Sequence, residues 1–453
     1  MDKYTRFSAR ASLAVMGKYV HQMEIWQTVE KHVHIKQKVI RHKPLDKLMD
    51  AFINILAGGA GLTEVNTRVR PDWVLQQAFG REGCADQSTV SDTLNACTDR
   101  TVGQMRQAMQ EIYRIHSQGY RHDYNQGWQV LDVDMTGMPA GRQGEGVTRG
   151  YFSGQKNRRG RQLGRVIATL YDEIVVECLY DGKRQLDRSL QALVTDTEQV
   201  LKLTKRRRQR TIVRVDAGGG RDEDINWLLR RDYHILGKVK NWRRAAKLAQ
   251  SVTVWYPDPK VPKREVGWVE SPHEYDRPTR QLAIRHRKKD GTWSYHVLVF
   301  TLTDSMVFWL ARRPFHMNHT PEEVLLASLQ AYDLRSGGVE TTIKGSKQGL
   351  GLTKRNKRLF AAQEMLVLLA QLAYNLISWT RNLLAVQSPS LRRLGMLRMV
   401  RDVFHIPGKA ILDSQDRILR ITLTNSHVLA PPLVRALAPI LDQDNVLLNL
   451  GQI

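Results

Sequence analysis

The sequence is short of acidic residues, of cysteine and of long apolar runs. Its 453 residues include 45 Asp and Glu against 69 Lys and Arg, which gives a formal net charge of +24. The three cysteines have neither zinc-ligand spacing nor the even number of a disulfide framework, which favours a reducing, intracellular compartment. The longest apolar stretch, residues 361–377, is interrupted by Gln, Glu and Asn. It therefore predicts a buried helix and not a membrane span.

The excess of positive charge indicates a polyanionic partner. Nucleic acid is the commonest polyanion that basic proteins bind. An anionic membrane is the alternative, but it would require an amphipathic anchor or an apolar span, and the sequence shows neither. The first ten residues, MDKYTRFSAR, lack the apolar core of a secretory signal. We therefore expect a nucleic-acid-binding protein that does not associate with membranes.

The first part of the chain, residues 1–122, has mostly helical patterns. Pro44–Leu56 places apolar residues at helical spacing, and Asp86 precedes a further helix as its polar cap. Short helices with polar and basic side chains on one face are typical of a DNA-binding bundle. A plain helical bundle explains these residues equally well.

The pattern changes to that of a mixed α/β domain near Gly127. Strands are expected at 128–136, 163–171, 174–180, 211–216 and 233–240, with helices at 187–203 and 222–231 and a basic, glycine-rich turn at 154–161. Three strands, helix, strand, helix, strand is the element order of the ribonuclease H-like fold, a mixed five-stranded sheet. Its first and fourth strands are neighbours, so we expect Asp134 and Asp216 to lie together.

The remaining chain interrupts and then completes this domain. Short β-rich segments rich in Trp, Lys and Arg predict an insertion, and a helix that begins near Pro321 is expected to carry residues 332–347. The predicted domains are a helical N-terminal DNA-binding domain (1–122) and a catalytic domain in two parts (123–241 and 318–386). A β-rich insertion (242–317) separates the two parts, and a helical C-terminal region (387–453) is expected to contact DNA or form a dimer.

The helix near residue 340 gathers groups with opposite charges. Glu340, Lys344 and Lys347 share one helix face, because residues four and seven apart lie above one another. A carboxylate among cations is typical of a metal ligand beside groups that hold phosphates. A surface helix with favourable Glu–Lys pairs is the alternative.

Two strand aspartates and this glutamate make a set that suits phosphoryl transfer. Asp134 on the first strand, Asp216 at the end of the fourth and Glu340 on the helix could hold two Mg²⁺ or Mn²⁺ ions about 3.5–4 Å apart. Taken singly, Asp216 is also explained as a turn or capping residue, and Asp132 shares the strand face of Asp134. The combination, on a strongly basic chain, favours the two-metal site.

The motifs around these acids resemble those of a known family. Asp134-Met-Thr136, Val215-Asp216-Ala-Gly, and Tyr332, Arg335, Glu340 and Lys347 with the following Gln-Gly-Leu-Gly-Leu are similar to the DDE transposases of bacterial insertion sequences. The resemblance is to the cut-and-paste group that has a β-rich insertion and a Tyr-Arg-Glu-Lys signature. It covers about residues 125–385.

The resemblance implies a DNA transposase that binds terminal inverted repeats, cleaves the ends with two metal ions and joins the 3′-hydroxyls to target DNA. It would act on double-stranded DNA in the bacterial cytoplasm, as a homodimer that brings two ends together. Asp134, Asp216 and Glu340 would bind the metals. The other expected DNA contacts are Tyr332, Arg335, Lys344, Lys347, Arg158, Arg159, Arg161 and Trp309.

Two of these assignments have alternatives in the sequence. Trp309 would stack on a base, but its apolar surroundings, Met306–Leu310, also suit a core tryptophan. Four residues separate Arg335 from Glu340 where the family has three, which rotates them by about 100° on an ideal helix. A π-bulge or a break at Gly337-Gly338 would restore a common face. A ribonuclease H-like nuclease without strand transfer, and a DNA-binding protein with a vestigial site, are the alternative functions.

Overall fold

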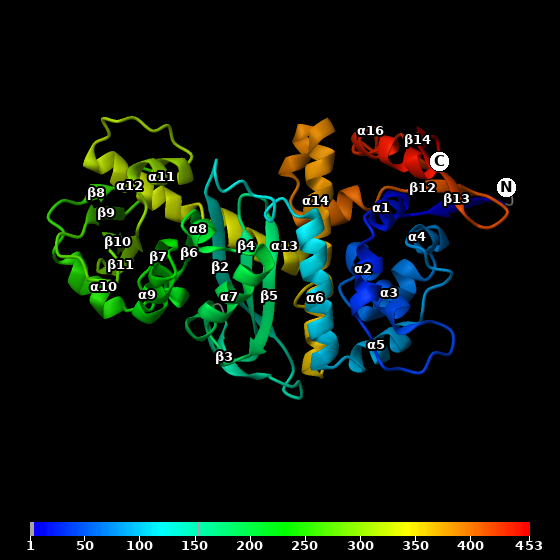
Figure 1. Cartoon of the computed structure of the whole chain (residues 1–453), viewed down its shortest axis with the longest axis horizontal. Coiled ribbons are helices and arrows are strands. Elements are labelled where there is room, and N and C mark those ends of the chain that lie inside the picture. Colours follow the sequence, from blue (N-terminus) through cyan, green and yellow to red (C-terminus); the bar gives the residue numbers. More distant parts are fainter. Residues whose placement is uncertain (1–3, 153) are drawn as a thin grey trace. The chain divides into compact units, whose positions relative to one another are not determined.

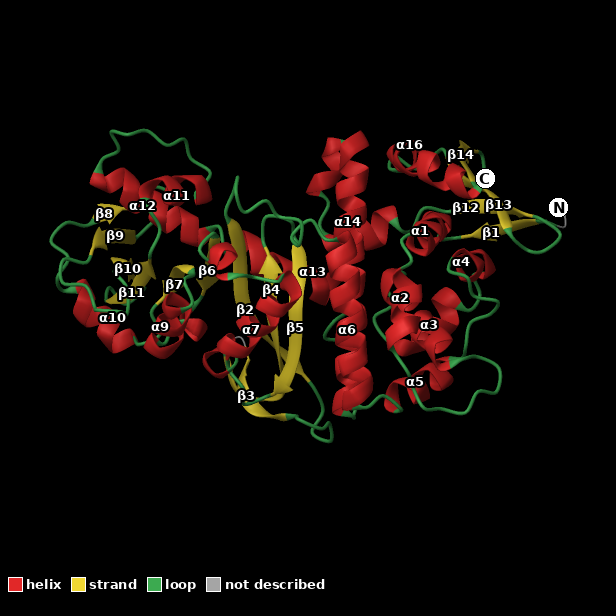
Figure 2. Ribbon diagram, viewed as in Figure 1, coloured by secondary structure: helices red, strands yellow, loops and turns green. Residues whose placement is uncertain are grey.

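The computed structural model describes residues 4–152 and 154–453, which divide into two compact units. Unit 1 comprises residues 1–117, 139–147 and 342–453, and unit 2 comprises residues 118–138 and 148–341. Positions 1–3 of the predicted N-terminal domain lie outside the described residues. Both units combine helices and sheet, so the chain has a mixed α/β fold (Figures 1 and 2).

Unit 2 is built on one large sheet. Its strand order is β3-β4-β2-β6-β7-β11-β10-β9-β8, and β5 pairs with β4 beyond the stretch of β4 that pairs with β3. The neighbours β2, β6 and β7 are parallel, while β3 and β5 are each antiparallel to β4. The strands are β2 (Gln129–Pro139), β3 (Thr148–Phe152), β4 (Gln155–Ala168), β5 (Glu173–Asp181), β6 (Thr211–Val215) and β7 (His234–Lys238). All five predicted strands are present, and β3 is additional.

The β-rich insertion extends this same sheet. Its strands are β8 (Tyr256–Pro257), β9 (Arg264–Trp268), β10 (Arg280–Arg287) and β11 (Trp293–Phe300), and β11 pairs with β7. The predicted β-rich segments are present, but the region also contains two helices, α10 (Trp242–Ala249) and α11 (Asp304–Leu310). Both helices are short, and each begins with a side-chain cap, Asn241 for α10 and Thr303 for α11.

The predicted turn at 154–161 is also wrong. Residues 155–161 belong to β4, which forms a hairpin with β3. The inward positions of β4 include Arg161 and Arg165, which are 1 % exposed, and Arg165 is paired with the buried Glu177. Because arginines occupy positions where apolar residues mark a strand, the segment has the composition of a solvated turn.

Helices cover the large sheet. They are α7 (Leu190–Leu201), α8 (Lys205–Arg208), α9 (Asp222–Arg230) and α12 (Pro321–Asp333), in addition to α10 and α11. Helices α11 and α12 bury an apolar cluster against the middle strands, which includes Val130, Ile212 and Leu298. Thr320 and Glu323 form a capping box that begins α12, close to the predicted start at Pro321. The end of α12 is tied to β6 by Arg214, which donates to the carbonyl of Ala331.

Unit 1 is mainly helical. Its principal helices are α1 (Ala11–Gln22), α2 (Ile25–His32), α3 (Pro44–Leu56), α4 (Trp73–Ala78), α5 (Gln87–Asn95), α6 (Asp99–His116), α14 (Phe360–Gln387) and α16 (Ala430–Leu441). Helix α14 packs against α3, α5, α6 and α16. It is the one helix in the described ranges with the length and apolarity of a membrane span, yet 89 % of its most apolar window is buried inside the protein. The predicted buried helix is therefore confirmed.

A small sheet joins the two ends of the chain within unit 1. It has the order β1-β12-β13-β14, with β1 (Thr5–Ser8), β12 (Gly408–Leu412), β13 (Ile418–Thr424) and β14 (Leu447–Gly451). The expectation of a helical C-terminal region is wrong for the segments that form β12, β13 and β14. Their pairing partners include β1, about 400 residues away in the sequence, so local periodicity carries little of the information that makes them strands.

Candidate active site

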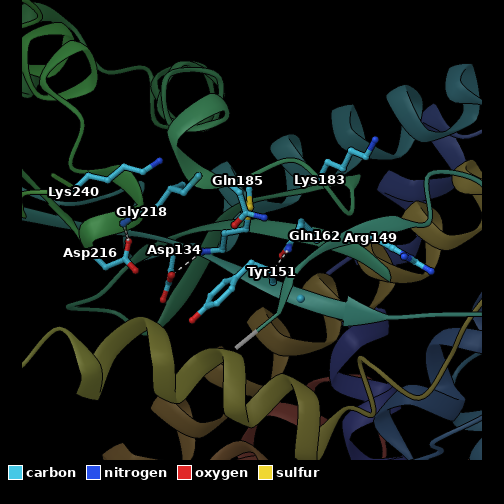
Figure 3. A pocket seen from close by; sticks show the side chains of 13 residues that line it. Asp134, Arg149, Tyr151, Gln162, Lys183, Gln185, Asp216, Gly218 and Lys240 are labelled. Atoms are coloured by element: carbon cyan, nitrogen blue, oxygen red, sulfur yellow. Dashed lines mark hydrogen bonds between the residues drawn. The ribbon is translucent and has the colours of Figure 1, made fainter. Parts of the chain in front are cut away.

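The parallel pairing of β2 and β6 brings Asp134 and Asp216 together. The last register pair of the two strands is Val133 with Val215, and the next residue on each strand is one of the two aspartates. Both side chains line one cleft with a volume of about 610 Å³ (Figure 3). The structure thus places two of the three predicted acids at one site.

Asp134 lies in an environment that disfavours its charge. Burial raises the pKa of its carboxyl to about 6, the guanidinium of Arg335 opposes this rise, and the charges of Asp216 and Glu340 add to it. The backbone N–H of Met135 donates to Asp134 at 2.7 Å. A cation in the cleft would favour the charged carboxylate, because it would offset both burial and repulsion.

Asp216 caps a turn, as one sequence interpretation expected, and also lines the cleft, as the other requires. It caps the short turn Ala217–Gly219, and its Oδ1 accepts a hydrogen bond from the N–H of Gly218 at 2.8 Å. Its Oδ2 has no hydrogen-bond partner within the described ranges. The capping bond therefore holds the side chain in place and leaves one carboxylate oxygen for a ligand in the cleft.

Asp132, the neighbouring acid on β2, has a structural role. It is fully buried and accepts hydrogen bonds from Nε and Nη2 of Arg214 at 2.6 and 2.7 Å. The hydroxyl of Thr169 donates to it at 2.7 Å. Since Arg214 also donates to the carbonyl of Ala331, this pair links β2 and β6 to the end of α12.

The predicted irregularity between Arg335 and Glu340 is a π-helical turn. It spans Ser336–Glu340 and separates α12 from α13 (Thr341–Gly349). A Cβ on Gly338 would lie 2.6 Å from Oδ2 of Asp132 and 2.9 Å from Cγ2 of Thr169, so only glycine fits against the sheet here. The π-bulge expected at the glycine pair is confirmed. It absorbs the extra residue and brings Arg335 and Glu340 together.

Arg335 lies between two of the acids. Its guanidinium is 4 % exposed and is 3.3 Å from Asp134 and 3.9 Å from Glu340, and its Nη2 donates to the carbonyl of Val133 at 2.9 Å. Tyr332, one turn earlier, is close enough to Arg335, Asp216 and Asp134 for their charges to act on it, and burial raises its pKa. Arg335 and Tyr332 therefore belong to the site.

The structure places Glu340 outside the cleft that the two aspartates line. Its side chain is 60 % exposed and does not line the cleft. Within residues 4–152 and 154–453, no group of three or more His, Cys, Asp or Glu side chains is spaced to hold a metal ion. The donor chemistry nevertheless fits a hard divalent cation, because Asp134 and Asp216 present only oxygen atoms and repel each other.

The other predicted contact residues differ in exposure. Arg158 is exposed and Arg159 is half-buried, whereas Arg161 is 1 % exposed. The prediction that Arg161 contacts phosphate is therefore wrong for this structure. Lys344 and Lys347 lie on α13 within unit 1, where the first is exposed and the second half-buried.

Trp309 is not a core tryptophan. It is 41 % exposed, whereas its neighbours on α11, Met306, Val307, Phe308 and Leu310, are all buried. The apolar surroundings in the sequence therefore describe the buried face of α11, and the indole lies on the other face. Its predicted contact with a base stays a prediction.

The cleft also contains residues that the sequence did not indicate. Arg149, Tyr151, Lys183 and Lys240 line it together with the two aspartates (Figure 3). Lys240 follows the end of β7, the strand beside β6, so the strand-end rule used for the aspartates could have found it. No such signal existed for Arg149 and Tyr151, because they lie on β3, which the sequence pattern did not reveal.

Comparisons with known proteins give one family. A family model described as transposase DDE domain group 1 matches residues 5–444. None of the curated proteins matches the chain at a significant level. Among solved structures, the cryo-EM structure of a piggyBac transposase synaptic complex with hairpin DNA is similar at 11 % sequence identity and a TM-score of 0.47, over 85 % of this chain and 79 % of that one.

Proposed function

The chain belongs to the transposase family with a group 1 DDE domain, and on this premise we propose that it cuts and joins DNA at the ends of an insertion sequence. It binds the terminal inverted repeats, cleaves them by metal-dependent phosphoryl transfer and joins the 3′-hydroxyls to target DNA. The adjacency of Asp134 and Asp216 on paired parallel strands carries this proposal. It works in the bacterial cytoplasm as a homodimer, because two ends must be held together.

The strand order supports a ribonuclease H-like core. The sequence β5-β4-β2-β6-β7 within the large sheet has three antiparallel strands followed by two parallel ones, with the first strand, β2, at the centre. This order places the carboxyl-terminal half of β2 beside the carboxyl end of β6. Acids at those positions face one cleft, which is the arrangement that two-metal chemistry requires.

The proposed mechanism assigns a role to each acid. When bound, two Mg²⁺ or Mn²⁺ ions would supply positive charge to the attacking and leaving oxygens of an in-line displacement. Asp134 would hold a metal in its deprotonated form, and Asp216 would hold it through the oxygen that is not used for capping. Glu340 would complete the set if Arg335 exchanged its contact with the acids for one with a phosphate.

The cations around the cleft would hold the DNA backbone. Lys183 and Lys240 line it, and Arg158 is exposed on β4. Phosphate contacts of this kind position DNA without reading its sequence, and they make binding weaker as salt rises. The recognition of a particular repeat sequence is therefore assigned to other parts of the chain, of which the helical unit 1 is the proposed one.

A plasmid assay tests the proposal. The parent protein is expected to nick and join a supercoiled plasmid that carries the inverted repeats flanking its own gene, in Mg²⁺ and not in chelator. Asp134→Asn is expected to abolish both steps, whereas Asp290→Asn, which changes an exposed acid in the β10–β11 turn, leaves them intact. Nicking without joined product would make the protein a nuclease that lacks strand transfer. Equal activity of Asp134→Asn would refute the assigned site.

A further inference from the structure

Besides the two aspartates, an aromatic ring and several cations line the cleft. Arg149 and Tyr151 lie on β3, Lys183 follows β5, and all three line the cleft. Tyr151 is 55 % exposed although it lines the cleft beside Asp134 (Figure 3). The side chains of Arg149 and Lys183 are exposed and have no ion pair or side-chain hydrogen bond among the residues that the structure describes. These three side chains are thus free to contact a ligand.

The backbone beneath Tyr151 is held firmly. Gly150 packs directly on the carbonyl oxygen of Gly182, and a Cβ there would overlap it. Gly160, which pairs with Thr148 of β3, packs in the same way on the carbonyl oxygen of Met138. The amide of Gln162, which is 2 % exposed, donates to the carbonyl of Tyr151 at 2.9 Å. An exposed aromatic ring on a fixed backbone presents its face with little loss of freedom on binding.

Resting on the proposed function, we propose that Tyr151, Arg149 and Lys183 form a subsite for an unpaired nucleotide next to the bond that is cut. Tyr151 stacks on the base, and the two cations contact the phosphates on either side of it. A cleft of about 610 Å³ has the volume of a small-ligand pocket and is too small to enclose a duplex. A base must leave its own stack before it can present a face to an aromatic side chain.

The subsite can be tested with the full-length chain in chelator, where no cleavage occurs. The probe is a short oligothymidylate that contains one 2-aminopurine, whose fluorescence falls when the base stacks on an aromatic ring. Tyr151→Leu is expected to weaken the quenched complex by about tenfold, since stacking on one aromatic residue contributes on that order, while Tyr151→Phe retains it. Replacing Arg149 and Lys183 by Gln is expected to reduce the salt dependence of binding by roughly 0.7 per cation.

The matched control is Leu170→Ala. Leu170 is 47 % exposed and follows the other end of β4, away from the cleft residues, so its loss should leave the quenching unchanged. If Tyr151→Leu binds the probe like the parent while the parent still nicks the repeat-bearing plasmid, the subsite is wrong and the proposed function stands. If the quenching depends on Tyr151 but the parent neither nicks nor joins DNA, the subsite stands and the proposed function fails.

Discussion

The guanidinium of Arg335 lies 3.3 Å from the carboxylate of Asp134. Arg335 is almost fully buried, and this contact raises its pKa while opposing the rise in the pKa of Asp134. The arginine therefore provides the compensating positive charge for an acid that burial would otherwise neutralise. It also extends to Glu340 at 3.9 Å, so one cation is shared between two acids of the proposed site.

Arg335→Gln should raise the pKa of Asp134 above about 6. Glutamine can still donate to the carbonyl of Val133, but it removes the charge that favours the carboxylate. Because a metal ligand must be deprotonated, Mg²⁺ binding is expected to require a higher pH in the variant. Calorimetric titrations of Mg²⁺ at several pH values would measure the change. The control is Arg158→Gln, at an exposed position of β4. An unchanged pH midpoint in Arg335→Gln would contradict the assigned contact.

Asp134→Asn should stabilise the folded protein near neutral pH. A carboxyl whose pKa rises from 3.8 on folding to about 6 destabilises the folded state above that pH by roughly 3 kcal/mol. The folded state binds the proton of Asp134 more tightly than the unfolded state does. The contribution of this carboxyl to the unfolding free energy is therefore fully present below pH 3.8 and is lost as the pH rises through about 6. Thermal unfolding at pH 4 and pH 8 should show a higher Tm for the variant at pH 8 alone. Mg²⁺ should raise the Tm of the parent only.

Asp132→Asn should have the opposite effect on stability. Its loss of charge leaves Arg214 buried without an anionic partner, which typically costs about 3–5 kcal/mol. Denaturant unfolding without metal would measure the difference between the two variants. If Asp132→Asn proves stable but inactive while Asp134→Asn unfolds readily, the assignment of the first acid is reversed.

The neighbourhood of the two aspartates could be predicted because it depends on regular strand pairing. Asp134 and Asp216 could be brought together from the sequence because strand order alone fixes their neighbourhood, and the glycine pair marked where the helix must bulge. Tyr151 could not be found, since β3 lies beside a strand whose inward positions are arginines. The small sheet of unit 1 was missed for another reason, because β1 and β12 pair across almost the whole chain.

Gly338→Ala tests whether the π-helical turn depends on close packing. The added methyl group would lie 2.6 Å from Oδ2 of Asp132, so the turn must shift, and a loss of about 1–3 kcal/mol in unfolding free energy is expected. Plasmid nicking should fall with it. Gly337→Ala, the neighbouring position, is the matched control because its Cβ would meet nothing within 4 Å. Equal stability and activity of the two variants would show that the turn tolerates displacement.

Glu340→Gln separates the chemistry from DNA binding. Glutamine keeps the size of the side chain but removes the charge that a hard divalent cation needs. Nicking and strand transfer should fall together, since both would use the same metal pair. Binding to DNA in chelator should stay the same or strengthen slightly, because a carboxylate that is 60 % exposed and repels phosphate is gone. Stability should change little, because the contact with Arg335 is long and exposed on the glutamate side.

The measurements are plasmid cleavage in Mg²⁺, a gel shift with repeat-bearing duplex in chelator, and the Tm of both proteins. A variant that cuts at the parent rate would exclude Glu340 as a ligand, and one that loses binding, cutting and Tm together would assign it to the fold.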